Sequence, residues 1–327
     1  MKDRLSGIQA LRGVAALAVV CRHALTEAGI TGWPSLLGAA GVDVFFVISG
    51  FVMAYTSDGQ SARNFLLRRI ARVVPLYWLA TLALVAIAAS GVAYQGQDIS
   101  VARILQSLAF VAADPVIFVG WSLNYEMFFY LLYAAMIALG LQRWSVAVIA
   151  LCMLASIASG APGISRPIVL EFAFGVGLGV AHLKGLTGRF AVPAAVLASA
   201  LFVATSMAGA QMPGAALPET IRWLWWGAPS LLAVYAALWW KPRFTLVGDA
   251  SYSIYLVHVV VMTVLAKVLE TGSVAVWIAI PLAVLASVAA GVLVYWTVEG
   301  PLHRRTSAFL RAAVAKPQRA ARTPEPA

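Results

Sequence analysis

The sequence predicts an all-α membrane protein, a polytopic helical bundle of about ten transmembrane helices with both termini in the cytoplasm. Two observations predict this fold class. Hydrophobic residues make up 62% of the 327 residues and charged residues only 11%, a balance that excludes a soluble globular protein. The apolar residues form long runs, and the alternation of apolar and polar residues typical of β-barrel strands does not occur in the sequence.

The expected spans follow from the lengths of the apolar runs. About ten runs are long enough to cross a bilayer, at residues 7–25, 38–56, 74–92, 119–139, 144–160, 166–182, 190–208, 221–240, 250–269 and 274–297. An amphipathic piece at residues 99–111 is expected to lie along the membrane. We expect residues 1–302 to form one integral-membrane domain and residues 303–327 to form a basic, disordered cytoplasmic tail.

The first apolar run carries a cation and an imidazole on one helical face. Eleven residues separate Arg12 from His23, about 1100° of rotation, so both side chains share a stripe and lie about 16 Å apart along the axis. Such groups are costly in a membrane unless they face a polar interior. The alternative places Arg12 and His23 at the membrane interface. A cleaved signal peptide is disfavoured, because Asp3 and Arg12 break its pattern.

The distribution of Lys and Arg predicts the orientation. Most of the 23 basic residues fall on the side of the N-terminus, which places that side in the cytoplasm. Only Arg103, Arg166 and Arg222 fall on the opposite side. The net charge of +10 therefore reflects topology, and we expect no nucleic-acid partner. Cys21 and Cys152 both lie inside apolar runs, so we expect neither a disulfide framework nor a metal site.

Three groups on three helices are expected at a similar depth near the outer face. They are His23, Asp43 and Glu126, with Glu126 about 8–10 Å below the outer boundary. A carboxylate that holds an imidazole in one tautomer raises its basicity, an arrangement that activates a hydroxyl nucleophile. The three residues are therefore candidate catalytic groups, and a buried structural pair is the alternative.

A second candidate site lies on the inner side. Arg69 and Arg72 are three residues apart, so they share a face if this stretch is helical, and they abut the membrane near Arg12. Guanidinium groups placed in this way suit a phosphate-bearing ligand. The alternative, an ordinary positive-inside signal, is preferred for Arg63 and Arg68.

The run at 250–269 opens with several hydroxyl side chains, which are typical of a helix that faces a polar interior. Ser251 and Tyr252 are candidate ligand contacts at its start. His258 is either a ligand contact or a helix–helix hydrogen bond, and the second interpretation is preferred. Glu299 is expected to pair with a nearby arginine, whereas Glu171 has no partner evident from the sequence.

Five motifs occur in order along nearly the whole chain. They are Leu11-Arg12-Gly13 with His23, the run Val44–Phe51, Arg69-x-x-Arg72 with Pro75-Leu76-Tyr77, Trp121-Ser122-Leu123-x-x-Glu126-x-x-Phe129-Tyr130, and Gly248-x-x-Ser251-Tyr252-Ser253-x-Tyr255-Leu256-x-His258. With these motifs the chain resembles the acyltransferase 3 family of integral-membrane O-acyltransferases. Members of that family modify polysaccharides, O-antigens, Nod factors and antibiotics, commonly with acetyl groups from acetyl-CoA.

The resemblance implies a stand-alone exopolysaccharide or O-antigen acetylase in the inner membrane of a bacterium. It implies acetyl-CoA as the acyl donor, a saccharide or lipid-linked saccharide as the acceptor, membrane lipids as further partners, and no metal. The family's arginines and histidine carry over to Arg12, His23, Arg69 and Arg72, and Ser251 and Tyr252 are expected to contact the donor as well. Direct transfer, an acyl-enzyme route and a homo-oligomer all stay open.

A protein of another class fits part of the pattern. A secondary transporter, or a flippase for a lipid-linked sugar, would also have about ten spans, polar residues at mid-membrane and both termini inside. Transporters often contain paired half-repeats with broken helices at matched positions, and the sequence shows no such pairing. A structural or sensory membrane subunit would leave the inner and outer clusters unexplained.

Overall fold

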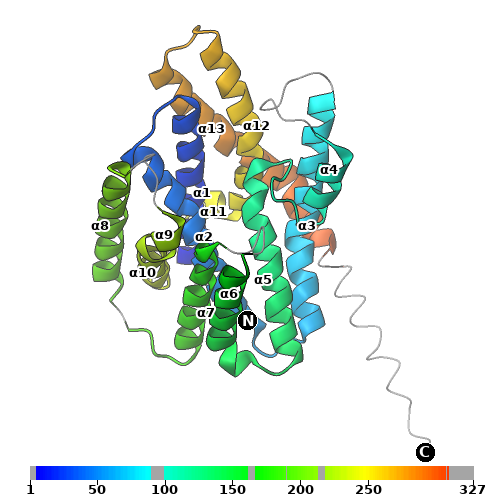
Figure 1. Ribbon diagram of the computed structural model, residues 1–327, viewed down its shortest axis with the longest axis vertical. Coiled ribbons are helices and arrows are strands. Elements are labelled where there is room, and N and C mark those ends of the chain that lie inside the picture. The colour runs from blue at the N-terminus through cyan, green and yellow to red at the C-terminus, as the bar shows by residue number, and fades with distance from the viewer. Residues whose placement is uncertain are drawn as a thin grey trace, which may run out of the picture.

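The computed structural model describes residues 5–89, 99–160, 166–188, 190–212, 218–306 and 308 (Figure 1). Within these ranges the chain is helical and contains no strand, which confirms the all-α class for this part of the protein. The α-helices are α1 (Ser6–Glu27), α2 (Trp33–Ser57), α3 (Ala62–Ala89), α4 (Val101–Leu108), α5 (Trp121–Ala138), α6 (Ser145–Ser159), α7 (Leu170–Leu183), α8 (Ala191–Ala210), α9 (Glu219–Trp225), α10 (Gly227–Ala237), α11 (Leu246–Asp249), α12 (Ser251–Glu270) and α13 (Val276–Val294).

Seven helices in the described part of the chain are long and apolar enough to cross a membrane. They span Ser6–Glu27, Trp33–Ser57, Ala62–Ala89, Gln142–Ser159, Ala191–Ala210, Ser251–Glu270 and Val276–Thr306. Each corresponds to one of the predicted runs. The predicted number of ten is not confirmed, and the cytoplasmic location of the termini remains a prediction of the charge distribution. Most of the predicted basic tail lies outside the described residues.

The other three predicted runs are helical but shorter or interrupted. The run at 119–139 forms a 3₁₀ turn at Phe118–Gly120 and then α5, and the run at 166–182 forms a 3₁₀ turn at Pro167–Val169 and then α7. The run at 221–240 divides into α9 and α10 at Trp226. The amphipathic piece forms α4, which lies beside α3 (Figure 1).

Helix α2 lies between α1 and α7 and packs closely against both (Figure 1). Glycines make this approach possible. A Cβ atom at Gly175 would lie 2.0 Å from the Val47 carbonyl oxygen, and one at Gly50 would lie 2.2 Å from the Phe172 carbonyl oxygen. Lipid chains are as apolar as leucine, so helices in a bilayer associate largely through such close packing. Small residues therefore fix the position of α2 and of the polar groups that it carries.

A second close contact joins α1 to the start of α12. A Cβ atom at Gly248, in α11, would lie 1.7 Å from the Gln9 carbonyl oxygen, and one at Gly13 would lie 3.0 Å from the Gly248 nitrogen. This contact holds the hydroxyl-rich start of α12 against the arginine-bearing end of α1. It thereby brings together two polar stretches that the sequence separates by more than two hundred residues.

We expect Gly175→Ala to lower the free energy of unfolding by about 1–3 kcal/mol, because the new methyl group would collide with α2. Unfolding by SDS in mixed micelles, followed by circular dichroism, would measure this loss. Gly177→Ala is the matched control on the same helix, since the nearest atom to its Cβ lies 3.9 Å away. Equal stability of the two variants would contradict the close packing of α2 against α7.

Candidate functional site

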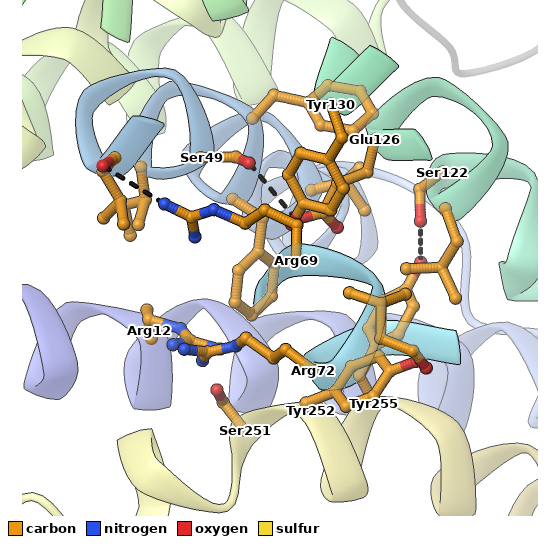
Figure 2. Close-up of a pocket in the computed structure, with 17 residues that line it drawn as sticks. Arg12, Ser49, Arg69, Arg72, Ser122, Glu126, Tyr130, Ser251, Tyr252 and Tyr255 are labelled. Carbon is orange, nitrogen blue, oxygen red and sulfur yellow. Dashed lines mark hydrogen bonds between the residues drawn. The ribbon is translucent and has the colours of Figure 1, made fainter. Parts of the chain in front are cut away.

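A cavity of about 90 Å³, measured as the space open to the centre of a water molecule, lies where α1, α2, α3, α5 and α12 meet (Figure 2). This volume holds several waters. The cavity is lined by Arg12, Val42, Phe45, Phe46, Ile48, Ser49, Val52, Arg69, Arg72, Val73, Ser122, Leu123, Glu126, Tyr130, Ser251, Tyr252 and Tyr255. The structure therefore brings together all five residues predicted to bind a phosphate-bearing donor, together with Glu126.

Three guanidinium groups dominate the cavity. Arg69 donates a hydrogen bond of 2.7 Å to the Thr56 hydroxyl and lies over the rings of Phe65 and Tyr130, 5.4 and 5.7 Å from their centroids. Arg12 donates to the Gln9 side chain at 3.3 Å. Arg72 points into the same space as Arg12 (Figure 2) and forms no hydrogen bond or ion pair with any residue that the structure describes.

Two carboxylates offset part of this positive charge. Glu126 accepts hydrogen bonds from the Ser49 hydroxyl, at 3.2 Å, and from the Tyr130 hydroxyl (Figure 2). Glu299 lies in the π-helical turn Tyr295–Glu299 that follows α13, accepts a hydrogen bond from Ser253, and lies within electrostatic range of Arg72 and Arg12. Three cations face two carboxylates, so the site keeps a positive charge that favours an anionic ligand.

Some hydroxyl groups of the cavity have hydrogen-bond partners within the protein and one does not. The Ser251 side chain is fully buried, and its oxygen has no hydrogen-bond partner among the described residues. Tyr252 donates to the Val73 carbonyl oxygen at 2.7 Å, and Ser122 pairs with Tyr255 at 2.8 Å. A buried polar atom without a partner calls for an explanation, such as a ligand or a water molecule. Ser251 and Arg72 are thus the groups available to a ligand here.

The predicted cluster of His23, Asp43 and Glu126 is wrong in its geometry. Glu126 faces the arginines, and Asp43 forms an ion pair with Arg222, with distances of 2.8 and 3.1 Å between their atoms. The His23 ring instead packs near His258, with centroids 5.3 Å apart. Among the described residues, neither carboxylate forms a hydrogen bond or ion pair with His23. The catalytic roles assigned to the three residues stay predictions.

Helix positions explain the error in depth. Helix α2 begins at Trp33, five residues before the predicted start, so Asp43 lies about 15 Å along the helix rather than near its end. Helix α5 begins inside the bundle, because the chain before it is buried: Val116 and Ile117 are 1% and 2% exposed. Asn124 donates to a carbonyl oxygen of this segment. Counting from the start of the apolar run therefore does not give the position of Glu126 within the bundle, where it lies beside Ser49 of α2.

A second charged cluster, which the sequence did not reveal, joins α2, α7 and α9. Arg222 binds both carboxylate oxygens of Asp43 and lies over the Trp226 ring, 4.9 Å from its centroid. Glu171 is fully buried within electrostatic range of both charged partners. Arg222 lies 179 residues from Asp43, and no local spacing signals the pair. The only signal was the presence of unpaired charges within apolar runs.

The imidazoles of His23 and His258 lie beyond the cavity along α1 and α12. His23 packs edge to face on Phe118, with ring centroids 4.8 Å apart. Tyr255 lines the cavity and also lies 5.9 Å from the His258 ring. This tyrosine therefore connects the arginine cavity to the imidazole pair.

The chain is similar to known proteins over a region that includes all the cavity residues. The chain matches the family model of the acyltransferase domain, acyltransferase 3, over residues 5–296. It is 36% identical over 306 residues to the exopolysaccharide production protein ExoZ of Rhizobium meliloti (strain 1021), covering 84% of this chain and 92% of that protein. Protein 2 in the picA locus of Rhizobium radiobacter is 40% identical over 84 residues, 24% of this chain and 42% of that protein. No solved structure matches the chain significantly.

We expect Arg222→Met to lower the free energy of unfolding by about 3–5 kcal/mol, because it leaves the Asp43 and Glu171 carboxyls buried without a cation. SDS unfolding in mixed micelles would measure this effect. The control is Glu270→Gln, which removes the exposed pair of Lys267 and Glu270 and is expected to cost about 1 kcal/mol or less. If Arg222→Met kept the stability of the parent but lost activity, the Asp43 cluster would belong to the chemistry rather than to the fold.

Proposed function

The chain belongs to the acyltransferase 3 family, as its motifs predict, and is a membrane acyltransferase; from this premise we propose its donor, acceptor and mechanism. In our proposal it takes an acetyl group from acetyl-CoA on the cytoplasmic side of a bacterial inner membrane. It transfers this group to a hydroxyl of an extracytoplasmic or lipid-linked saccharide. The family assignment favours this enzyme over the transporter or flippase considered above.

The observation that carries the donor assignment is the cavity of three guanidiniums with two polar groups left free. Arg72 has no hydrogen-bond or ion-pair partner among the described residues, and the buried Ser251 hydroxyl has none either. CoA carries several phosphate oxygens, which guanidinium groups bind through two parallel hydrogen bonds. In this proposal Arg12, Arg69 and Arg72 bind the CoA phosphates, and Ser251 and Tyr252 lie against the donor.

The chemistry requires a base near the reacting hydroxyl. His23 lies on the same helix as Arg12, about 16 Å further along the axis, so a bound donor extends its pantetheine arm from the arginines toward the imidazole. His23 takes the proton of the acceptor hydroxyl, and the acceptor oxygen attacks the thioester carbonyl carbon. The C–S bond then breaks, and the proton passes from His23 to the thiolate. The products are the saccharide ester and free CoA.

The alternative route through an acyl-histidine uses the same side chain as the nucleophile. In both routes His23 contacts the reacting atoms. Glu126 in this proposal offsets the charge of Arg12 and Arg69, within whose electrostatic range it lies. It does not orient the imidazole, because its hydrogen bonds are to Ser49 and Tyr130. Asp43 has its charge committed to Arg222.

The acceptor assignment draws on the most extended similarity. The relative that matches over 84% of this chain is named an exopolysaccharide production protein, which supports a saccharide acceptor. Mass spectrometry of the surface polysaccharide, from strains with and without the gene, tests this assignment directly. Loss of ester-linked acetyl groups in the deletion strain is the expected result, and identical polysaccharides would contradict it.

We expect Arg72→Ala to weaken acetyl-CoA binding about ten- to a hundredfold, because one charge-assisted contact of about 1.5–3 kcal/mol is lost. Arg72→Lys should restore only part of the affinity, since lysine lacks the planar fork of donors. Isothermal titration of purified protein in nanodiscs measures both values. Arg63→Ala is the matched control, because Arg63 lies exposed on the same helix and does not line the cavity. Unchanged binding by Arg72→Ala would refute the donor site.

We expect His23→Ala to abolish acetyl transfer and to leave acetyl-CoA binding nearly unchanged, because the imidazole lies away from the phosphate site. The transfer assay uses inverted membrane vesicles from the deletion strain, complemented with each variant and supplied with radiolabelled acetyl-CoA. Label incorporated into the saccharide is divided by the amount of folded protein. Turnover by His23→Ala close to that of the parent would show that His23 is not the base.

A further inference from the structure

Two imidazole rings from different helices lie side by side beyond the arginine cavity. The centroids of His23, on α1, and His258, on α12, are 5.3 Å apart, and the ring planes differ by 32°. Phe118 packs against both rings, with centroids 4.8 Å from His23 and 6.5 Å from His258. Tyr255 lies on the side of the cavity, 5.9 Å from the His258 ring. Phe118 and Tyr255 therefore flank the pair.

The protonation of His258 follows from its own helix. Its Nδ1 atom lies 3.2 Å from the Ile254 carbonyl oxygen, which can only accept a hydrogen bond, so Nδ1 carries the proton. In the neutral ring the Nε2 atom then carries the lone pair. This Nε2 atom is fully buried and has no hydrogen-bond partner among the residues described. His258 thus presents a fixed acceptor that the fold does not satisfy.

His23 is the group placed to satisfy this acceptor. A ring nitrogen lies about 1.2 Å from its centroid, so rings at this separation can bring facing nitrogens to about 3 Å, the length of a hydrogen bond. A rotation of the His23 ring about its side-chain bonds would turn one of its nitrogens toward His258. One nitrogen of His23 would then donate to His258, and the other would present its lone pair to a substrate. The geometry makes His258 able to select the reactive tautomer of His23.

We propose that His258 is the positioning residue of the acyl transfer and acts through His23. This inference rests on the proposed function, and it gives His258 the role that the sequence suggested for Asp43 and Glu126. Both carboxylates are occupied, by Arg222 and by Ser49 with Tyr130. A neutral imidazole also suits the surroundings, because a carboxylate beside Phe118 would bring a further charge into the membrane interior.

The proton balance is the same as in the proposed transfer. The hydroxyl proton moves to the free nitrogen of His23 while the acceptor oxygen attacks the thioester carbon, and it leaves with the CoA thiolate. His258 keeps its Nδ1 proton and accepts the hydrogen bond from His23 throughout. The charge on His23 in the transition state is stabilised by the Nε2 lone pair. His258 itself touches neither substrate.

The kinetic test compares His258→Leu with His258→Gln in the vesicle assay with radiolabelled acetyl-CoA. Leucine removes the acceptor, and we expect the saturating rate per folded molecule to fall about ten- to a hundredfold with an unchanged half-saturating concentration of acetyl-CoA. Glutamine offers a carbonyl oxygen as acceptor and should recover much of this rate. His182→Leu is the matched control, because His182 lies on α7 with Thr187 as its partner.

The rescue by glutamine and the unchanged half-saturating concentration separate a positioning role from a structural one. A structural role predicts equal losses in the two variants, because both remove the imidazole. Three results would overturn the proposal: a His258→Leu rate within threefold of the parent, equal losses in the leucine and glutamine variants, or a raised half-saturating concentration of acetyl-CoA in His258→Leu.

A spectroscopic measurement tests the pairing of His23 and His258 independently of the proposed function. The chain has only 4 histidines, so nitrogen-15 labelling of their rings allows their tautomers to be assigned by solid-state NMR in lipid. We expect a single His23 tautomer in the parent and a mixture in His258→Leu. An unchanged His23 spectrum in that variant would refute the pairing. Vesicles of the parent protein that transfer no acetyl group from acetyl-CoA would refute the proposed function alone.

Discussion

The placement of positive charge inside an apolar helical bundle is the constraint on which the rest of the site depends. Arg12, Arg69 and Arg72 come from two helices, and removing their charges from water is costly unless each finds partners. Arg69 is held by Thr56 and two aromatic rings, whereas Glu126 and Glu299 supply negative charge nearby. The glycine contact between α11 and α1 completes the enclosure by bringing in the start of α12. The same helix packing therefore offsets part of the positive charge and leaves Arg72 available to an anionic ligand.

The bundle keeps two groups of charges apart. The pair of Asp43 and Arg222 lies among α2, α7 and α9, with Glu171 within electrostatic range. Arg222 supplies the positive charge of this group. The arginine cavity lies among α1, α2, α3, α5 and α12. A buried pair is weak support for stability by itself, but the loss of one partner leaves an uncompensated charge. In the first group Asp43 and Arg222 are paired with each other, whereas the second keeps Arg72 and Ser251 free for a ligand.

The sequence predicts the parts of the fold and site that depend on local spacing. Apolar runs predict the helices, and the three-residue spacing of Arg69 and Arg72 predicts that they reach one cavity with Arg12. Depth is not local. The early start of α2 and the buried segment before α5 decide where Asp43 and Glu126 lie, and the lengths of apolar runs do not fix such boundaries. Arg222 pairs across 179 residues, which only the folded chain can show. The sequence predicts a helix–helix hydrogen bond for His258, but a single sequence does not reveal that His23 is its neighbour.

The relation of α1 to α12 explains how one site can serve binding and chemistry together. On α1 the chain passes from Arg12 to His23, and on α12 it passes from Ser251 to His258, seven residues or about 10 Å further along. Arg12 and Ser251 line one cavity, and the two imidazoles meet beyond it with Tyr255 between. The residues proposed to bind the donor phosphates and the imidazoles proposed to act at the thioester thus lie on the same two helices. Close backbone contact at Gly13 and Gly248 fixes α1 relative to the start of α12. A donor held by its phosphates at one end would have its thioester positioned at the other by rigid elements, so that binding energy is converted into orientation of the reacting atoms.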